Sequence, residues 1–271
     1  MAIIISLTSF GNRLEESAYR AICTLLDQTV EARVVLYLDK HSPTPKLRNL
    51  TSLEIVEGCK DIGSYSKLVW ALQQFPNDTL ITADDDVYYP RNWLQMLLEQ
   101  HEKYPDKIIA HRAHGVTFKN DGLAPFLEWH ERVKDAPVLF PMGVGGVLYP
   151  PDSLHEDATN SELFLKLSPR QDDIWFWAMA VLNDKQHHVV PNGYRWSNRI
   201  DENNKAGGTC LWEYNIFGGG DDVQLKAVVE YYPKLQEWVK FTARNICSAN
   251  HTVACPSGLD NGAESTTKRD Y

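Results

Sequence analysis

The chain has 271 residues, of which 43% are hydrophobic, enough to build one sizeable core. Its formal net charge of −9 argues against a general nucleic-acid binder, because such affinity depends on a basic face that meets phosphates. The sequence shows no signal-peptide pattern, and no apolar run approaches the ~20 residues of a membrane-spanning helix. Its five scattered cysteines lack the short spacing of zinc or redox sites, so we expect a cytoplasmic protein.

Apolar strands and amphipathic helices alternate over the first 110 residues. Strands are expected at 2–8, 32–38, 53–56, 79–83 and 107–110. Ser64 is the expected cap of the helix that follows it, and 41–49, with two prolines, is expected to be an irregular loop. A repeated strand-helix unit predicts an α/β fold with a Rossmann-like, mixed, mostly parallel sheet flanked by helices.

Three consecutive carboxylates, Asp84, Asp85 and Asp86, come directly after the strand at 79–83. Adjacent carboxylates repel one another unless a cation lies among them, and a hard divalent ion with oxygen ligands would remove that repulsion. Open α/β sheets bind their ligands at the carboxyl ends of strands. The pattern therefore predicts a metal site there, and the alternative is a solvated acidic turn.

The strand-helix alternation ends after Ala110, and later segments suggest further elements. A glycine-rich stretch, 142–150, leads into an apolar strand, and its glycines suit either a close approach to a ligand or a bulge. Residues 168–171 have the pattern of a capping box with proline at the first helical position. An edge strand is expected at 186–190, and the last helix at 225–241.

Two carboxylates, Asp172 and Asp173, begin the helix that follows the predicted capping box. The helix dipole alone favours acidic groups at this position, so a purely structural role is one interpretation. Trp175 and Trp177 come directly after them, and a carboxylate on the rim of an aromatic pocket is placed to act as a base on a bound hydroxyl. Trp212 lies between two glycine clusters in a segment typical of a mobile flap.

Four pieces in this order resemble the nucleotide-sugar-dependent glycosyltransferases of the GT-A fold, particularly family 2-like bacterial enzymes that assemble lipopolysaccharide or capsule. They are the opening strand with Arg13, residues 61–67, the DxD-type triplet 84–86, and 172–173 after the glycine-rich strand. The likeness covers about 3–190. It implies a single catalytic domain over 1–255 with a nucleotide-sugar-binding half, 1–110, and an acceptor-binding half, 111–255. We expect 256–271 to be a disordered tail.

The resemblance also implies roles for single residues. The nucleotide sugar, with a UDP-sugar expected, would contact Thr8, Ser9, Arg13, Asp39, Asp61, Lys67, Asp84 and Asp85. Asp84 and Asp86 would hold Mn²⁺ or Mg²⁺ on the diphosphate, and Asp173, with Asp172 beside it, would be the general base of an inverting hexosyltransferase. On the acceptor side the candidates are Gly145, Gly146, Trp175 and Trp212. A third protein ligand for the metal is not obvious, and the candidates are His187, His188 and His251.

No QxxRW-type processive motif follows, which favours a single addition to a saccharide or lipid-linked saccharide acceptor. That acceptor suggests peripheral contact with the inner membrane. A sugar-1-phosphate nucleotidyltransferase is one competing hypothesis, although it would need a basic, glycine-rich loop after the first strand. A non-catalytic carbohydrate-binding module is another, because aromatic platforms would explain Trp129, Trp175, Trp177, Trp196 and Trp212.

Overall fold

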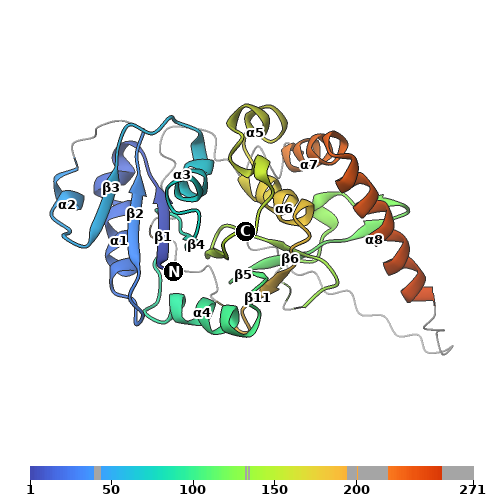
Figure 1. Ribbon diagram of the computed structural model, residues 1–271, viewed down its shortest axis with the longest axis horizontal. Helices are drawn as coiled ribbons and strands as arrows, with labels where there is room; N and C mark the ends of the chain where they lie inside the picture. Colours follow the sequence, from blue (N-terminus) through green and yellow to red (C-terminus); the bar gives the residue numbers. More distant parts are fainter. Residues whose placement is uncertain (40–43, 132, 134, 194–199, 201–218, 252–271) are drawn as a thin grey trace, which may run out of the picture.

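The computed structural model describes residues 1–39, 44–131, 133, 135–193, 200 and 219–251 (Figure 1). A seven-stranded sheet has the order β3-β2-β1-β4-β10-β5-β11. Its strands are β1 (Ile3–Thr8), β2 (Arg33–Tyr37), β3 (Leu53–Val56), β4 (Thr79–Thr82), β5 (Ile108–Ala110), β10 (Val147–Tyr149) and β11 (His187–Val189). All neighbours are parallel except β10, which is antiparallel to β4 and β5. The predicted mixed, mostly parallel α/β sheet is confirmed.

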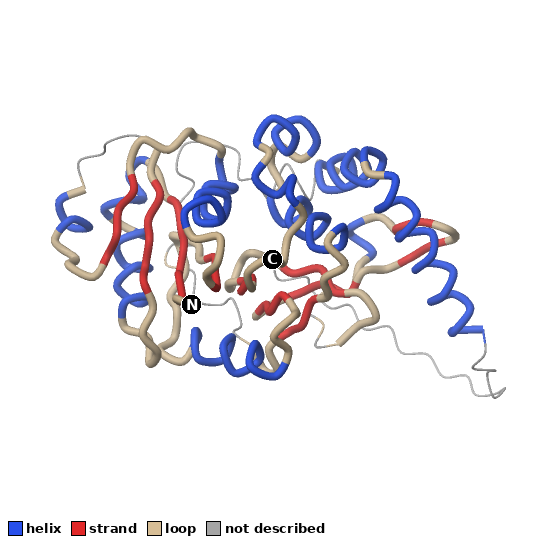
Figure 2. Tube along the Cα trace, viewed as in Figure 1, coloured by secondary structure: helices blue, strands red, loops and turns tan. Residues whose placement is uncertain are grey.

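Helices cover both faces of this sheet (Figure 2). One face packs on α1 (Ser17–Leu26) and α4 (Trp93–Lys103), and the other on α3 (Ser66–Gln74), α6 (Asp172–Leu182) and α7 (Gly220–Tyr231). Side chains alternate between the two cores along a strand, so Ile4 faces the α3 side while Ile5 faces the α1 side. Burial on both faces explains why these strands are apolar throughout.

Small sheets in the second half of the chain, and short helices along its whole length, complete this frame. The pairs are β6 (Ala113–Gly115) with β9 (Leu139–Pro141), and β7 (Phe118–Lys119) with β8 (Gly122–Leu123). The short helices are η1 (Gly11–Glu15), η2 (Gly63–Tyr65), η3 (Phe126–Glu128), η4 (Glu156–Thr159) and α5 (Ser161–Leu167). In the part of the chain that the structure describes, no helix is both long and apolar enough to cross a bilayer.

The carboxyl ends of β1 and β4 meet at one edge of the sheet. These two strands are parallel neighbours with Ser6 opposite Thr82, and the backbone N–H of Ala83 donates to the carbonyl of Ser6. The order 3-2-1-4 places the reversal of strand order between β1 and β4, where open α/β sheets form their ligand crevice. Residues just after Thr8 and Thr82 therefore share that crevice.

Two predicted helix caps are wrong. Ser64 lies inside η2, and its hydroxyl donates to Asp172 instead of capping α3. Ser168 ends α5, because its N–H closes the last turn on Phe164, and α6 begins only at Asp172 with Gln171 as its N-cap. In both cases the serine bonds a different segment or turn from the one that the local pattern indicates.

The last helix is two helices, not the expected single one. Pro233 begins α8 (Pro233–His251) directly after α7, because proline lacks the N–H and the free space that a continuous helix needs. The expected irregular loop contains a one-turn helix, α2 (Pro45–Arg48), with proline in its favoured first position. The glycine-bracketed flap and the tail at 256–271 lie outside the described residues. Figure 1 shows α8 at the end of the molecule opposite β3.

Candidate active site

The loop after β1 holds the loop after β4 by direct contacts. A guanidinium nitrogen of Arg13 lies 2.6 Å from a carboxylate oxygen of Asp85 and 2.9 Å from one of Asp86. The Ser9 hydroxyl donates to the other oxygen of Asp85 at 2.5 Å. Burial raises the pKa of Asp85 to about 6, against the opposing effects of Arg13 and Ser9. The acidic triplet therefore forms an ordered loop that is ion-paired with the Arg13 side chain, and it is not a solvated turn.

Lys67 connects this acidic loop to the start of α6. Its ammonium lies 3.1 Å from an oxygen of Asp84 and 3.3 Å from one of Asp172. Burial alone would lower the pKa of Lys67, but Asp172, Asp84 and Asp173 together raise it well above its usual value. The side chain is a buried counter-ion shared by two segments that are far apart in the sequence.

Asp173 is held by a backbone group. The N–H of Gly143 donates to both of its carboxylate oxygens at 3.0 Å. Burial and the neighbouring Asp172 raise the pKa of Asp173 to about 7, although Lys67 and Gly143 oppose that shift. A Cβ on Gly143 would lie 2.7 Å from an oxygen of Asp173 and 3.3 Å from the Lys67 nitrogen, so this approach requires a glycine.

The assembled cluster has more negative than positive charge. It contains five acidic side chains, Asp84, Asp85, Asp86, Asp172 and Asp173, against the two cations Arg13 and Lys67. Their oxygens are the donors that Mg²⁺ and Mn²⁺ prefer, and one or two carboxylates suffice when substrate phosphates and water complete the shell. Within the described ranges, no three or more His, Cys, Asp or Glu side chains are grouped to hold a metal unaided. The residues thus fit an ion that shares its ligands with a substrate.

Three further predicted nucleotide-binding residues lie on neighbouring turns. Thr8 ends β1 and donates its hydroxyl to the Tyr37 carbonyl at 2.9 Å. Asp39 is exposed just after β2, and Asp61 is exposed and accepts the N–H of Gly63 at 2.9 Å in a local turn. Their roles toward a nucleotide stay predictions.

The two glycines expected on the acceptor side are explained by packing. Gly145 and Gly146 have φ values of +101° and +100°. The Gly145 carbonyl accepts the indole N–H of Trp93 at 2.6 Å, and a Cβ on Gly146 would lie 2.4 Å from the Trp93 ring. Positive φ values and close packing against Trp93 therefore account for both glycines. The glycine that touches the acids is Gly143, which the sequence analysis missed although it belongs to the same stretch.

The expected aromatic rim beside Asp173 is wrong. Trp175 and Trp177 are 0% and 2% exposed and pack in the core, where the Trp175 indole donates to the Ala158 carbonyl. A helix that is apolar on all sides is buried on all sides, and that signal was present in the sequence. Trp212 lies outside the described residues, so its predicted role has no structural account.

Two of the histidines proposed as the third metal ligand lie far from the acidic cluster. His187 and His188 lie on the edge strand β11, which β5 and β10 separate from β4. Three strand spacings place them about 14 Å away from the acidic strand. Burial lowers the pKa of His187 to about 3, so this half-buried imidazole is neutral at pH 7. The side chain of His251 falls outside the described set.

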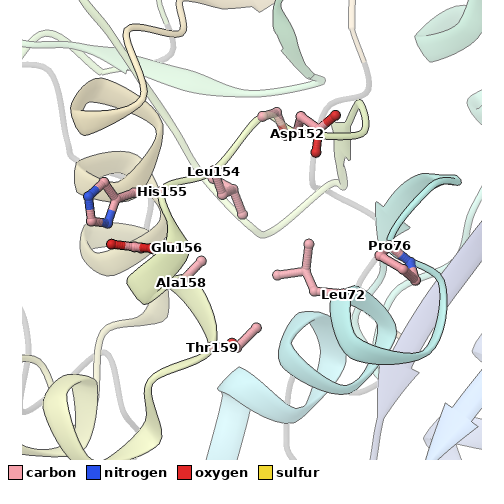
Figure 3. Close-up of a pocket in the computed structure, with 9 residues that line it drawn as sticks. Leu72, Pro76, Asp152, Leu154, His155, Glu156, Ala158 and Thr159 are labelled. Atoms are coloured by element: carbon pink, nitrogen blue, oxygen red, sulfur yellow. The ribbon is translucent and has the colours of Figure 1, made fainter.

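A small pocket of about 160 Å³ lies at the opposite edge of the sheet (Figure 3). Leu72 and Pro76, near the start of β4, form one side, and residues after β10, including Leu154 and Ala158, form the other. None of the predicted site residues lines it. The acidic cluster, and not this pocket, is therefore the candidate active site.

No protein-family model matches the chain, and no curated protein matches its sequence. Among solved structures, it is similar to a CMP:2-keto-3-deoxy-manno-octonic acid synthetase complexed with CTP, at 13% identity and a TM-score of 0.43 over 73% of this chain and 92% of that chain. It is also similar to S. aureus TarS 1-349 in complex with UDP, at 17% identity and a TM-score of 0.46 over 70% of this chain. A second S. aureus TarS structure matches at 16% identity and a TM-score of 0.44, also over 70% of this chain. The chain spans 57% and 37% of the length of these two TarS chains.

Proposed function

We propose that this chain is a metal-dependent glycosyltransferase that moves a sugar from a nucleoside-diphosphate sugar to a saccharide hydroxyl with inversion. The observation that supports it is the single ion-paired cluster in which Lys67 joins the acidic loop after β4 to the carboxylates that begin α6. This cluster lies at the sheet edge where strand order reverses. A UDP-sugar donor, a lipid-linked or free saccharide acceptor, a cytoplasmic location and peripheral contact with the inner membrane are parts of the same proposal.

The donor side would use Asp84 and Asp86 to hold Mn²⁺ or Mg²⁺. When bound, the ion would neutralise charge on the departing nucleoside diphosphate. Arg13 fixes Asp85 and Asp86 through its two ion pairs, and Ser9 fixes the far oxygen of Asp85. Because the cluster has an excess of carboxylates, it repels a diphosphate, so we expect donor binding to depend strictly on a divalent cation.

The acceptor side would use Asp173 as the general base. Its carboxylate would take the proton from the attacking hydroxyl, and Gly143 would keep both oxygens in place during that transfer. General-base catalysis is most effective when the pKa of the base lies near the operating pH. The pKa of Asp173, about 7, suits a reaction at neutral pH. Such a group contributes roughly 10² to 10⁴ in rate.

The contacts of Lys67 and Arg13 favour this reaction over a nucleotidyltransferase. Arg13 is the cationic side chain of the loop after β1, and it is bound to Asp85 and Asp86. The ammonium of Lys67 is enclosed by acids, so we propose that it is their counter-ion and not a nucleotide ligand. A carbohydrate-binding module has little support, because no tryptophan in the described part of the chain is exposed.

Nucleotide release from a panel of nucleotide sugars, with and without Mn²⁺, tests the proposal. We expect release only with the ion, and NMR of the product should show the anomeric configuration opposite to that of the donor. An Asp86→Asn variant should lose the Mn²⁺ effect, whereas Asp27→Asn, in an exposed ion pair with Arg91, should keep it. Pyrophosphate release from a nucleoside triphosphate and a sugar phosphate, or saccharide binding without turnover, would contradict the proposal.

A further inference from the structure

The start of α7 contacts the turn 168–171, which directly precedes the two carboxylates at the start of α6. An oxygen of Asp221 accepts the side-chain N–H of Gln171 at 2.7 Å. The side-chain oxygen of Gln224 accepts the backbone N–H of Arg170 at 2.8 Å. Both α7 side chains are 3% exposed. Two buried polar groups from a distant helix thus bond the two residues that directly precede Asp172.

The same turn is held on its other side by η2 and by a hydrogen bond of its own. The Tyr65 hydroxyl donates to the carbonyls of Ser168 and Gln171, and the Ser168 hydroxyl donates to the Gln171 carbonyl at 2.8 Å. The Gln224 amide is itself fixed, because its NH₂ group donates to the Gly220 carbonyl at 2.9 Å. The turn 168–171 therefore lies between two rigid elements.

These tertiary contacts replace the local side-chain cap that usually fixes the start of a helix, here α6. Gln171 is the N-cap of α6, and its side chain makes no capping hydrogen bond. Helix starts are normally fixed by such a bond from the N-cap side chain to a backbone N–H. Here the Gln171 side chain reaches outward to Asp221, so α7 determines how the first turn of α6 is held.

We propose that Asp221 and Gln224 are positioning residues, and that the start of α7 acts as a latch on the turn 168–171 that sets the direction of Asp172 and Asp173. The catalytic consequence rests on the proposed function. A base must be held to within about 0.5 Å and 10–20° of its productive geometry. Because Asp173 lies only two residues after the latched Gln171, a movement of the turn would move Asp173 as well. Its own contact with Gly143 fixes the carboxylate only if the turn below it does not move.

The second oxygen of Asp221 indicates that the latch serves geometry more than stability. This oxygen is buried and has no hydrogen-bond partner among the described residues. A buried, unsatisfied carboxylate oxygen is unfavourable for folding. An asparagine would keep one acceptor for Gln171 and put an NH₂ group, also without a partner, in place of the unsatisfied charged oxygen. The Asp221→Asn variant should therefore keep the latch and melt at about the same temperature as the native chain.

Two disruptive variants, Gln224→Met and Asp221→Leu, test the latch in the full chain. Hydrogen exchange at the amides of 172–175 should accelerate, and kcat should fall by about tenfold to a hundredfold while donor affinity is kept. The acid limb of the pH profile should shift as well, because the environment of Asp173 changes. Asp221→Asn and Lys226→Met, the latter on the same helix with a 73% exposed side chain, should behave like the native chain in exchange and kcat.

Hydrogen exchange separates the latch from the proposed function. If the native chain turns over no nucleotide sugar, the proposed function fails, and the exchange of 172–175 still decides whether the latch exists. Exchange and kcat in Gln224→Met equal to those of Lys226→Met would overturn it. A parallel loss of donor affinity and kcat would also overturn it, because a positioning role predicts a loss in kcat alone. If Asp221→Leu does not fold, Gln224→Met alone gives the answer.

Discussion

The two sides of the cluster balance their carboxylates in different ways. On the donor side, Asp85 and Asp86 share one guanidinium, and Asp85 also accepts from the Ser9 hydroxyl. On the acceptor side, Asp173 accepts a backbone N–H, which carries no full charge and cannot be lost by titration. A nearby cation favours the ionised form of an acid and burial opposes it, so the pKa of Asp85 is raised to about 6, whereas that of Asp173 is raised to about 7. The difference fits one group of acids for binding a cation and one acid for proton transfer.

Replacing Asp173, the proposed general base, should have the largest effect. Asp173→Asn keeps an oxygen for the Gly143 N–H but cannot take a proton, so kcat should fall a hundredfold or more with donor affinity unchanged. Steady-state kinetics and calorimetric titration of the donor measure the two quantities. Asp172→Asn is the matched variant, and a larger loss there than in Asp173→Asn would give the base role to Asp172.

Removing a carboxylate from the cation-binding side should affect the metal dependence instead. In Asp86→Ala, Mn²⁺ should no longer stimulate donor binding or turnover, a loss on the order of a hundredfold at saturating ion. The melting temperature without metal should change little, because Asp85 keeps its contact with Arg13. Metal titration of turnover and a melting curve check both points, and an unchanged Mn²⁺ response would remove Asp86 from the metal site.

Adding one methyl group at Gly143 tests the dipole contact directly. The new Cβ would lie 2.7 Å from an Asp173 oxygen, so the carboxylate must move, and kcat should fall by about tenfold or more. Gly122→Ala is the control, because its Cβ would meet only the Lys119 carbonyl at 4.0 Å. Equal kcat values in the two variants would show that the position of Asp173 does not matter.

The pH dependence should show the smallest change. The pKa of Asp173 is raised to about 7 in the folded chain, from about 3.9 for an unfolded aspartate. As a base it must be ionised, so kcat should rise with pH through about 7. The folded state binds this proton more tightly, so the associated stability is complete below about pH 3.9 and is lost as pH rises through 7.

Urea unfolding between pH 5 and 8 checks the stability part of this prediction. The native chain should lose stability as pH rises, and Asp173→Asn should lose less. Some slope should remain in the variant, since burial also raises the pKa of Asp85 and of Asp221 to about 6. An identical slope in the two proteins would contradict the raised pKa of Asp173.

The donor side could be predicted from the sequence, and the surroundings of Asp173 could not. Parallel strands bring their carboxyl ends together, so strand order predicts that the residues after β1 and those after β4 share one edge, and the resemblance adds Ser9 and Arg13 to the same site. The contacts of Asp172 and Asp173 come from Ser64 and Gly143, and those of the preceding turn from Asp221. These segments meet only through the packing of α3, α6 and α7, which local patterns do not encode.

Local rules also competed with one another around α6. Ser168 with Pro169 matches a capping box, yet α5 uses this serine for its own last turn. The acids before Trp175 and Trp177 predict a sugar-facing aromatic rim. Their spacing within a helix that is apolar on every side was the stronger signal, and it predicts the burial that the structure has.

The reversed strand β10 has a consequence for how the chain folds. It lies between β4 and β5, so β5 pairs with β10 on one side and with β11 on the other. During synthesis β5 emerges before either partner, and the sheet cannot close across its middle until both have been made. The halves on either side of Ala110 should therefore fold together rather than in succession, a non-local and slow route. A fragment ending at residue 110 should accordingly leave the amides of β5 open to exchange with solvent.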